Sequence, residues 1–169
     1  MSISELCRKM IEFSADNTHD ICHFLKVYAY AKTIGELEGL DEKTQYTLEA
    51  AALVHDIACP LCRVKYGDTS GAHQELESEG VLRGFFADAD MQPEILERII
   101  SLVSRHHTYT GVDGADMRIL LEADYLVNAD ESHYTRAQII SAAEIVFETA
   151  AGKELLNTIY IDQEEKTNE

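Results

Sequence analysis

The sequence has 169 residues, of which 46% are hydrophobic and 27% are charged, with only nine glycines and two prolines. This composition excludes a disordered chain, and the scarcity of turn formers argues against a sandwich or barrel with many tight turns. The 14 Lys and Arg residues against 31 Asp and Glu give a formal net charge of -17, which disfavours binding to a nucleic-acid polymer. A chain of this length can bury a core without disulfides or a structural metal.

Helical periodicity runs through almost the whole chain and predicts an all-α fold, a single-domain helical bundle over residues 1–169. Apolar residues at steps of three and four define the helices, and capping residues and glycines set their ends. The expected helices are Ser4–Ala15, Asp20–Leu37, a third that is N-capped by Asp41 and runs to His55, Gln74–Phe86, Pro93 to His106 or His107, Asp116–Asn128 and Thr135–Ala150.

The remaining segments are expected to be irregular. Residues 57–73 contain Pro60 and two glycines and are predicted to form a long loop, and residues 108–115 a second one. Gly152 is expected to end the last helix, and the polar tail 162–169 is expected to fray.

The N-terminus lacks the pattern of a signal peptide, and no apolar run approaches the ~18 residues of a membrane span. We therefore expect a cytoplasmic protein with no membrane partner.

The cysteines are Cys7, Cys22, Cys59 and Cys62. The Cys59–Cys62 pair could be half of a zinc site or a redox pair, but no second close pair completes a Cys₄ site. Free thiols, as in a reducing compartment, are the preferred interpretation.

Three polar residues occupy helix faces that should be buried. Each lies at helical spacing from apolar neighbours: His23 from Val27 and Ile34, His55 from Leu48 and Ala52, and Asp124 from Leu120 and Val127. A buried, unpaired carboxylate costs several kcal/mol, so Asp124 needs a proton, a cation or a metal.

Asp56 directly follows His55, and adjacent helical residues diverge by about 100°, so both can face one ion only where the helix ends. With such an end, His23, His55, Asp56 and Asp124 would supply two imidazoles and two carboxylates. That set suits Mn, Fe, Co, Ni or Zn, permits Mg and hardly suits calcium. Each residue taken alone has an ordinary alternative, since a buried His is often satisfied within the core and a buried Asp is often paired with Lys or Arg.

The order of these residues resembles the HD superfamily of metal-dependent phosphohydrolases. The family signature is an isolated His, an adjacent His-Asp pair and a distant Asp, which here are His23, His55 with Asp56, and Asp124. The flanks are similar too: a basic residue and Val follow the first His, an apolar run ends in His-Asp-Ile, and a second apolar run ends in Ala-Asp. The resemblance covers about residues 18–130.

The resemblance implies a hydrolase acting on a small phosphorylated substrate, a nucleotide or a related phosphate ester. It implies the four residues above as metal ligands and gives Asp56 a further role in orienting or deprotonating the attacking water. Many HD domains continue the His-Asp-Ile segment with Gly and Lys, whereas Ala58 and Cys59 stand here. The phosphate-binding role is therefore left to Lys65 or Arg63. Lys26 stands where Arg is common.

Relatives with two metals carry further histidines. His106 and His107 fall where such residues often occur, and the resemblance implies a second-metal or substrate role for them, with Lys65 completing the charge around the phosphate. The alternative is a helix C-terminus that favours cationic side chains. None of the residues near the start of the fourth helix fits the pattern cleanly: His73, Gln74, Glu75 and Glu77. His19 and His133 are expected to be ordinary surface residues.

Two other functions remain as alternatives. One is a non-catalytic, metal-containing domain that binds a nucleotide or signalling molecule, and the other is a di-iron oxygenase of the HD type. The intact ligand set favours an enzyme over a sensor, and the incomplete second-metal pattern favours a hydrolase over an oxygenase. The substrate, the number of ions and the oligomeric state do not follow from the sequence.

Overall fold

The computed structural model describes residues 1–162, and these contain helices and no strand. The all-α fold class predicted from periodicity is therefore confirmed. The helices are α1 (Ile3–Ser14), α2 (Thr18–Leu37), α3 (Glu42–Val54), α4 (Cys59–Tyr66), α5 (Gly71–Phe85), α6 (Pro93–Val103), α7 (Ala115–Glu131), α8 (Arg136–Val146), α9 (Ala150–Leu156) and the π-helix η1 (Asn157–Ile161). Apart from Asp162, the predicted frayed tail lies outside the described residues. None of the described helices is both long and apolar enough to cross a membrane.

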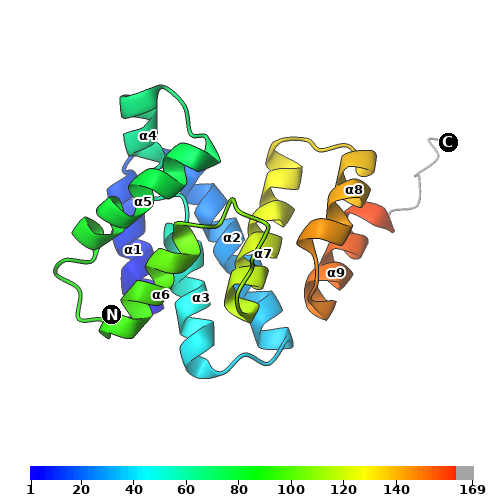
Figure 1. Ribbon diagram of the computed structural model, residues 1–169, viewed down its shortest axis with the longest axis horizontal. Helices are drawn as coiled ribbons and strands as arrows, with labels where there is room; N and C mark the ends of the chain where they lie inside the picture. The colour runs from blue at the N-terminus through cyan, green and yellow to red at the C-terminus, as the bar shows by residue number, and fades with distance from the viewer. Residues whose placement is uncertain (163–169) are drawn as a thin grey trace.

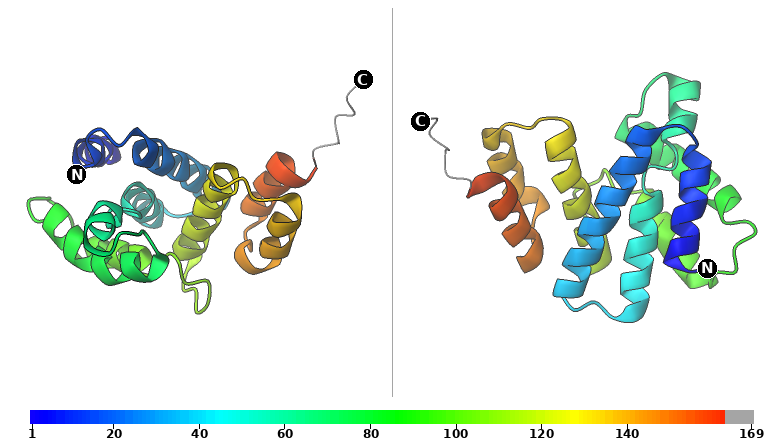
Figure 2. Two further views of the ribbon diagram at one scale, coloured as in Figure 1. Left: turned by 90° about the horizontal axis from the view of Figure 1, so that it is seen from above. Right: turned by 180° about the vertical axis from the view of Figure 1, so that it is seen from behind.

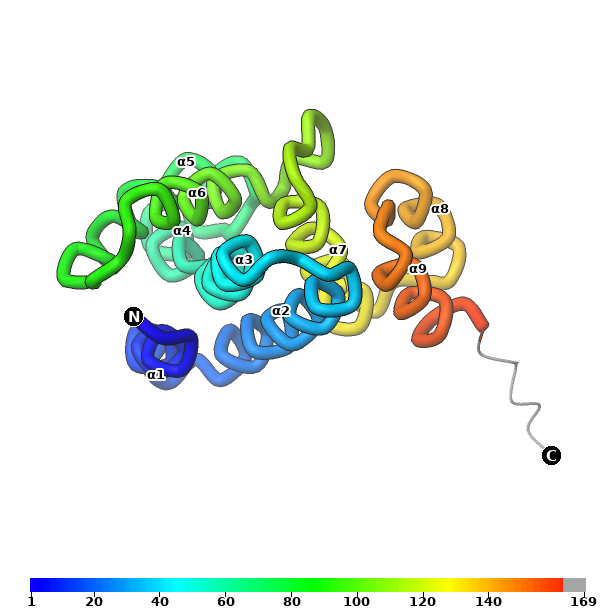
Figure 3. Tube along the Cα trace, turned by 90° about the horizontal axis from the view of Figure 1, so that it is seen from below, coloured from blue at the N-terminus to red at the C-terminus, as the bar shows by residue number. Residues whose placement is uncertain are grey.

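Helix α3 lies at the centre of the bundle. Helices α1 and α2 lie along one side of it, and α4, α5 and α6 lie on the other (Figure 3). Seen from behind, α1, α2 and α3 run side by side (Figure 2), while α7 packs against α2 and α3 and carries α8 and α9 beyond it (Figure 1). Every residue from Thr47 to Val54 is buried, and three consecutive alanines in this stretch let neighbouring helices approach from several directions.

The segment 57–73 is not the long loop that we predicted, because α4 occupies Cys59–Tyr66. Pro60 lies in the first turn of this helix, where its missing N–H costs nothing, so it starts the helix instead of breaking one. Gly67 ends the helix in the left-handed conformation, with φ 78°. The helix packs on α5 through an ion pair between Lys65 and Glu77 at 2.6 Å.

The prediction of one helix over Thr135–Ala150 is also wrong, because the segment contains α8 and the start of α9. Helix α8 stops at Val146, Phe147 is extended and buried, and α9 begins after the N-cap Thr149. Gly152 does not end a helix but lies within α9, where a Cβ would collide with the buried carboxylate of Glu122. That carboxylate accepts hydrogen bonds from the backbone N–H groups of Glu148 and Thr149, at 2.7 and 2.9 Å. Because Glu122 belongs to α7, these bonds hold the connection between α8 and α9 against α7.

The central position of α3 predicts where the fold is most sensitive. Leu53→Ala removes a fully buried side chain and should lower the free energy of unfolding by about 2–5 kcal/mol in urea denaturation. Leu76→Ala makes the same chemical change at a side chain that is 69% exposed, and it should stay within about 0.5 kcal/mol of the wild type. Equal losses in the two variants would contradict the central role of α3.

Candidate metal centre

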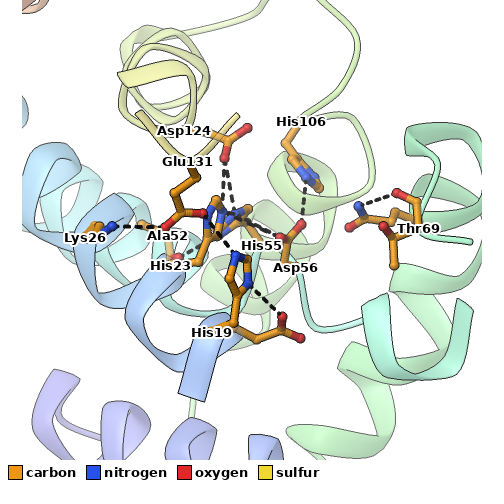
Figure 4. A network of polar contacts seen from close by, with 12 residues as sticks. His19, His23, Lys26, Ala52, His55, Asp56, Thr69, His106, Asp124 and Glu131 are labelled. Carbon is orange, nitrogen blue, oxygen red and sulfur yellow. Dashed lines mark hydrogen bonds and ion pairs between the residues drawn. The ribbon is translucent and has the colours of Figure 1, made fainter. Parts of the chain in front are cut away.

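Four side chains from three helices converge on one point between α2, α3 and α7 (Figure 4). His23 comes from α2, His55 and Asp56 from the end of α3, and Asp124 from the middle of α7. The Nε2 atoms of His23 and His55 are 3.1 Å apart, and Asp124 Oδ1 lies 3.3 and 3.4 Å from them. Asp56 Oδ2 lies 3.6 Å from each of the two nitrogens. The structure therefore brings together the four residues predicted as ligands.

The end of α3 explains how two consecutive residues face the same point. His55 is the C-cap, and the chain then tightens, with the N–H of Ile57 donating to the carbonyl of Val54 at 3.0 Å. Residues 55–58 form a turn before α4 begins, so the 100° divergence of a continuing helix does not apply.

Hydrogen bonds outside the cluster determine which nitrogen of each imidazole faces inward. His55 Nδ1–H donates to the carbonyl of Ala52 at 2.9 Å, and because a carbonyl can only accept, the proton is on Nδ1. His23 Nδ1–H donates to the carboxylate of Glu131 at 2.8 Å. Both rings therefore direct their Nε2 atoms to the centre. In neutral rings these two atoms are acceptors and repel each other at 3.1 Å, unless a proton or a metal ion lies between them.

The charges at the cluster also favour a proton or a metal ion at its centre. Burial opposes the charged form of His23, but Asp124, Asp56 and Glu131 outweigh it and raise the pKa of His23 to about 9. Burial raises the pKa of Asp124, yet the facing imidazoles reverse this and hold it well below the usual value. The carboxylates thus stay ionised and attract a cation. Two imidazole nitrogens and two carboxylates suit a divalent transition metal, so the residues fit the ion that was predicted.

A second group of possible ligands adjoins the first. Asp56, His106 and His107 bring ligand atoms within 4.8 Å of one another, and Asp56 belongs to both groups. Its Oδ2 faces the first group, while its Oδ1 lies 3.5 Å from His106 Nε2 (Figure 4). His106 Nδ1–H donates to the carbonyl of Val103 at 2.7 Å, which again turns Nε2 inward. Among the described residues, the Nε2 atoms of His106 and His107 are buried without a hydrogen-bond partner.

The two histidines follow α6 instead of ending it, since the helix stops at Val103 and not at His106 or His107 as predicted. Burial, and then the neighbouring His106, lower the pKa of His107 to about 4. His107 is therefore neutral near pH 7 and can act as a ligand. The alternative, a helix C-terminus that favours cationic side chains, does not agree with a neutral His107 beyond the end of α6.

Comparison with known proteins agrees with the geometry. Residues 20–148 match the family model of the HD domain. The chain belongs to the HD domain family. The crystal structure of a predicted HD superfamily hydrolase from an uncultured Thermotogales bacterium has a similar fold, with a TM-score of 0.66 and 24% identity over 94% of this chain and 83% of that one. No curated protein matches the chain.

This HD domain has supporting residues that the sequence analysis missed. Glu131, at the end of α7, accepts hydrogen bonds from His23 and from Lys26 Nζ at 3.1 Å. Burial would raise the pKa of Glu131, but these two partners outweigh it and hold the pKa below its usual value. The signal was in the sequence, because Asp124, Asn128 and Glu131 recur at steps of four and three and share a helix face.

A pocket adjoins the two clusters. Its lining includes some of the residues that were expected to contact a substrate and leaves out others. Arg63 lines it and is held by Asp20 through two hydrogen bonds of 2.7 and 2.9 Å. Lys65 is not part of its lining, because two residues along α4 turn its side chain about 200° away from Arg63, toward Glu77. His19 lines the pocket, although 74% of its side chain is exposed, as expected for a surface residue.

The candidate residues at the start of α5 also include one that lines the pocket and others that do not. Gln74 is buried and lines the pocket, and its Oε1 has no hydrogen-bond partner among the described residues. Glu75 accepts a hydrogen bond from Thr108, and the ring of His73 stacks on Tyr66, so neither lines the pocket. All four cysteines are free, and buried Cys59 forms part of the pocket lining.

The first prediction for this site concerns metal content. Asp56→Ala removes the carboxylate that both clusters share and should lower the bound divalent metal at least ~10-fold, as measured by elemental analysis after dialysis. The matched control is Asp88→Ala, an exposed carboxylate that does not line this pocket, which should leave the content unchanged. Equal loading of Asp56→Ala and wild type would exclude this residue as a ligand.

The second prediction concerns Glu131. Glu131→Gln keeps the shape of the side chain but removes the negative charge that supports His23, so affinity for Zn²⁺ or Mn²⁺ should fall roughly 10- to 100-fold in calorimetric titration of the apoprotein. Asp130→Asn is the control, because its 69% exposed carboxylate lies 3.7 Å from the same Lys26. An unchanged affinity in Glu131→Gln would show that the contact plays no part in metal binding.

Proposed function

We propose that this HD domain is a metal-dependent phosphohydrolase that acts on a small phosphorylated substrate. The observation that carries the proposal is Asp56, whose two carboxylate oxygens face two groups of ligand atoms at the base of one pocket. Shared carboxylates suit the hydrolysis of phosphate esters, in which both the attacking and the leaving oxygen need stabilisation. Membership of the HD domain family and the description of the structurally similar protein as a predicted hydrolase support the same reaction class.

The charges around the pocket support a phosphorylated ligand only when metal is bound. Arg63 offsets Asp20 and Lys26 offsets Glu131, which leaves Asp56 and Asp124 without a Lys or Arg partner. One divalent ion neutralises these two carboxylates. A phosphate dianion needs positive charge beyond that, which a second ion at His106 and His107 would supply. We therefore infer that substrate binding depends on the second group of ligands as well as the first.

Each residue then has a defined part in the reaction. The chemistry that a bound metal would supply is polarisation of the substrate's phosphoryl group and a lower pKa for a bound water molecule. Asp56 is ionised, because burial raises its pKa but His55 and His106 outweigh that effect, so the carboxylate can accept a hydrogen bond from the attacking water and orient it. Arg63, held in place by Asp20, lines the pocket wall, where the guanidinium N–H groups that Asp20 does not use can donate hydrogen bonds to a phosphate.

The activity follows as a prediction. Wild-type protein supplied with Mn²⁺, Co²⁺, Ni²⁺ or Mg²⁺ should release inorganic phosphate from members of a panel of small phosphate esters, and chelation should abolish the release. His55→Ala and Asp56→Ala should each lose at least ~100-fold in kcat/KM, since a metal ligand is removed in both. The surface variant Asp88→Ala should retain wild-type rates. Full activity in both site variants would point to a contaminating phosphatase.

A separate prediction addresses the second group. His106→Ala should leave metal at the first group but lower turnover at least ~10-fold, about 1.4 kcal/mol of activation free energy. Metal content and phosphate release are measured on the same preparation. Unchanged turnover in His106→Ala, in His107→Ala and in the double variant would leave the pair without a function in the reaction.

A di-iron oxygenase is the second candidate, because the second group of ligand atoms is more complete than the sequence pattern indicated. Hydrolysis needs no O₂, so phosphate release in an anaerobic chamber separates the two activities. Substrate binding without any turnover would instead favour the non-catalytic binding domain.

A further inference from the structure

The pocket above the metal centre has an unusual lining. Its volume is about 280 Å³, and its walls are made of carboxylate, imidazole, amide, hydroxyl and guanidinium side chains and one thiol. Among the described residues that line it, there is no aliphatic side chain and no Phe or Tyr. Ligand pockets in proteins are usually lined mainly by hydrophobic and aromatic side chains. This pocket therefore offers a ligand mainly hydrogen bonds and charge.

The polar groups continue outward from the metal centre along α7. Asp124, Asn128 and Ser132 follow one another at steps of four residues and all line the pocket. A helix rises 1.5 Å per residue, so Asn128 lies about 6 Å, and Ser132 about 12 Å, farther along the axis than Asp124. A phosphate held at the clusters would place the first atoms of its ester group beside Asn128, whose partly buried amide can both donate and accept hydrogen bonds.

The described residues of this lining include no Phe, Tyr or Trp that could cover a nucleobase. Proteins recognise bases by stacking them on Phe, Tyr, Trp or His rings or on an Arg guanidinium plane. Of the imidazoles in the lining, His23 and His107 belong to the metal groups. His19 lies at the rim, with one nitrogen 3.5 Å from Asp20 and the other 3.8 Å from Glu131. Both carboxylates lie along the edge of the ring, and the side chain is 74% exposed, so His19 offers a stacking face only at the mouth of the pocket.

We propose that the pocket selects small, polyhydroxylated phosphate esters, such as sugar or polyol phosphates, over nucleotides, and that Asn128 is a specificity-determining residue. This inference rests on the proposed phosphohydrolase function and narrows its substrate class. The hydroxyl groups of such an ester match walls that can donate and accept hydrogen bonds, and the ester has no flat aromatic ring that needs a stacking partner.

Ribose 5-phosphate and AMP provide a matched comparison, because they share the same 5-phosphoester and differ in the adenine. The Mn²⁺-loaded wild type should hydrolyse ribose 5-phosphate with a kcat/KM at least ~10-fold above that for AMP. Equal or better hydrolysis of AMP would overturn the specificity while leaving the phosphohydrolase intact. Phosphate release from neither compound, nor from any other ester in the panel, would overturn the proposed function itself.

Asn128→Leu tests the residue, with ethyl phosphate as the internal reference because it carries no hydroxyl on its alkyl group. The ratio of kcat/KM for ribose 5-phosphate to that for ethyl phosphate should fall at least ~10-fold, mainly through KM. General damage to the site would lower both rates and leave the ratio unchanged, so an unchanged ratio would remove Asn128 from the proposal. Asp88→Ala is the control for the ratio. The wild-type comparison tests the substrate class even if Asn128→Leu fails to fold.

Discussion

The buried carboxylate of Asp124, facing the Nε2 atoms of His23 and His55, is the contact on which the rest of the site depends. A carboxylate at this depth is tolerated only with a cation beside it, and two inward-facing imidazole nitrogens impose the same demand. The requirement joins α2, α3 and α7, the three helices that also form much of the core packing. A site for binding a cation and the centre of the fold are therefore built from the same contacts.

Three members of this cluster could be picked out of the sequence because they break a pattern, and the resemblance to the HD superfamily joined them with Asp56 into one site. His23, His55 and Asp124 stand on otherwise apolar helix faces, and a polar residue there must be explained by a partner. The fold class followed from the same periodicity. The helix end predicted at His55 is also what allows Asp56 to face the site, because only a terminated helix turns consecutive side chains to one point.

Other features could not be read locally because their causes lie far away in the chain. The hydrogen bond between Glu131 and His23 joins residues 108 positions apart, and only the shared face of α7 indicated it. Gly152 looked like a helix end, but it is required by the carboxylate of Glu122, which packs against it from another helix. Pro60 contributed to the prediction of a loop over residues 57–73, although proline is also favoured in the first turn of a helix, where it lies in α4.

The most direct test of the account is to locate the metal itself. Crystals of the protein grown or soaked with Mn²⁺ should give an anomalous peak bounded by Nε2 of His23, Nε2 of His55 and the carboxylates of Asp56 and Asp124. Such a peak, missing in Asp124→Asn crystals treated in the same way, would establish the cluster as a metal centre. A wild-type map with no peak there, or with peaks only at surface carboxylates, would contradict the central claim.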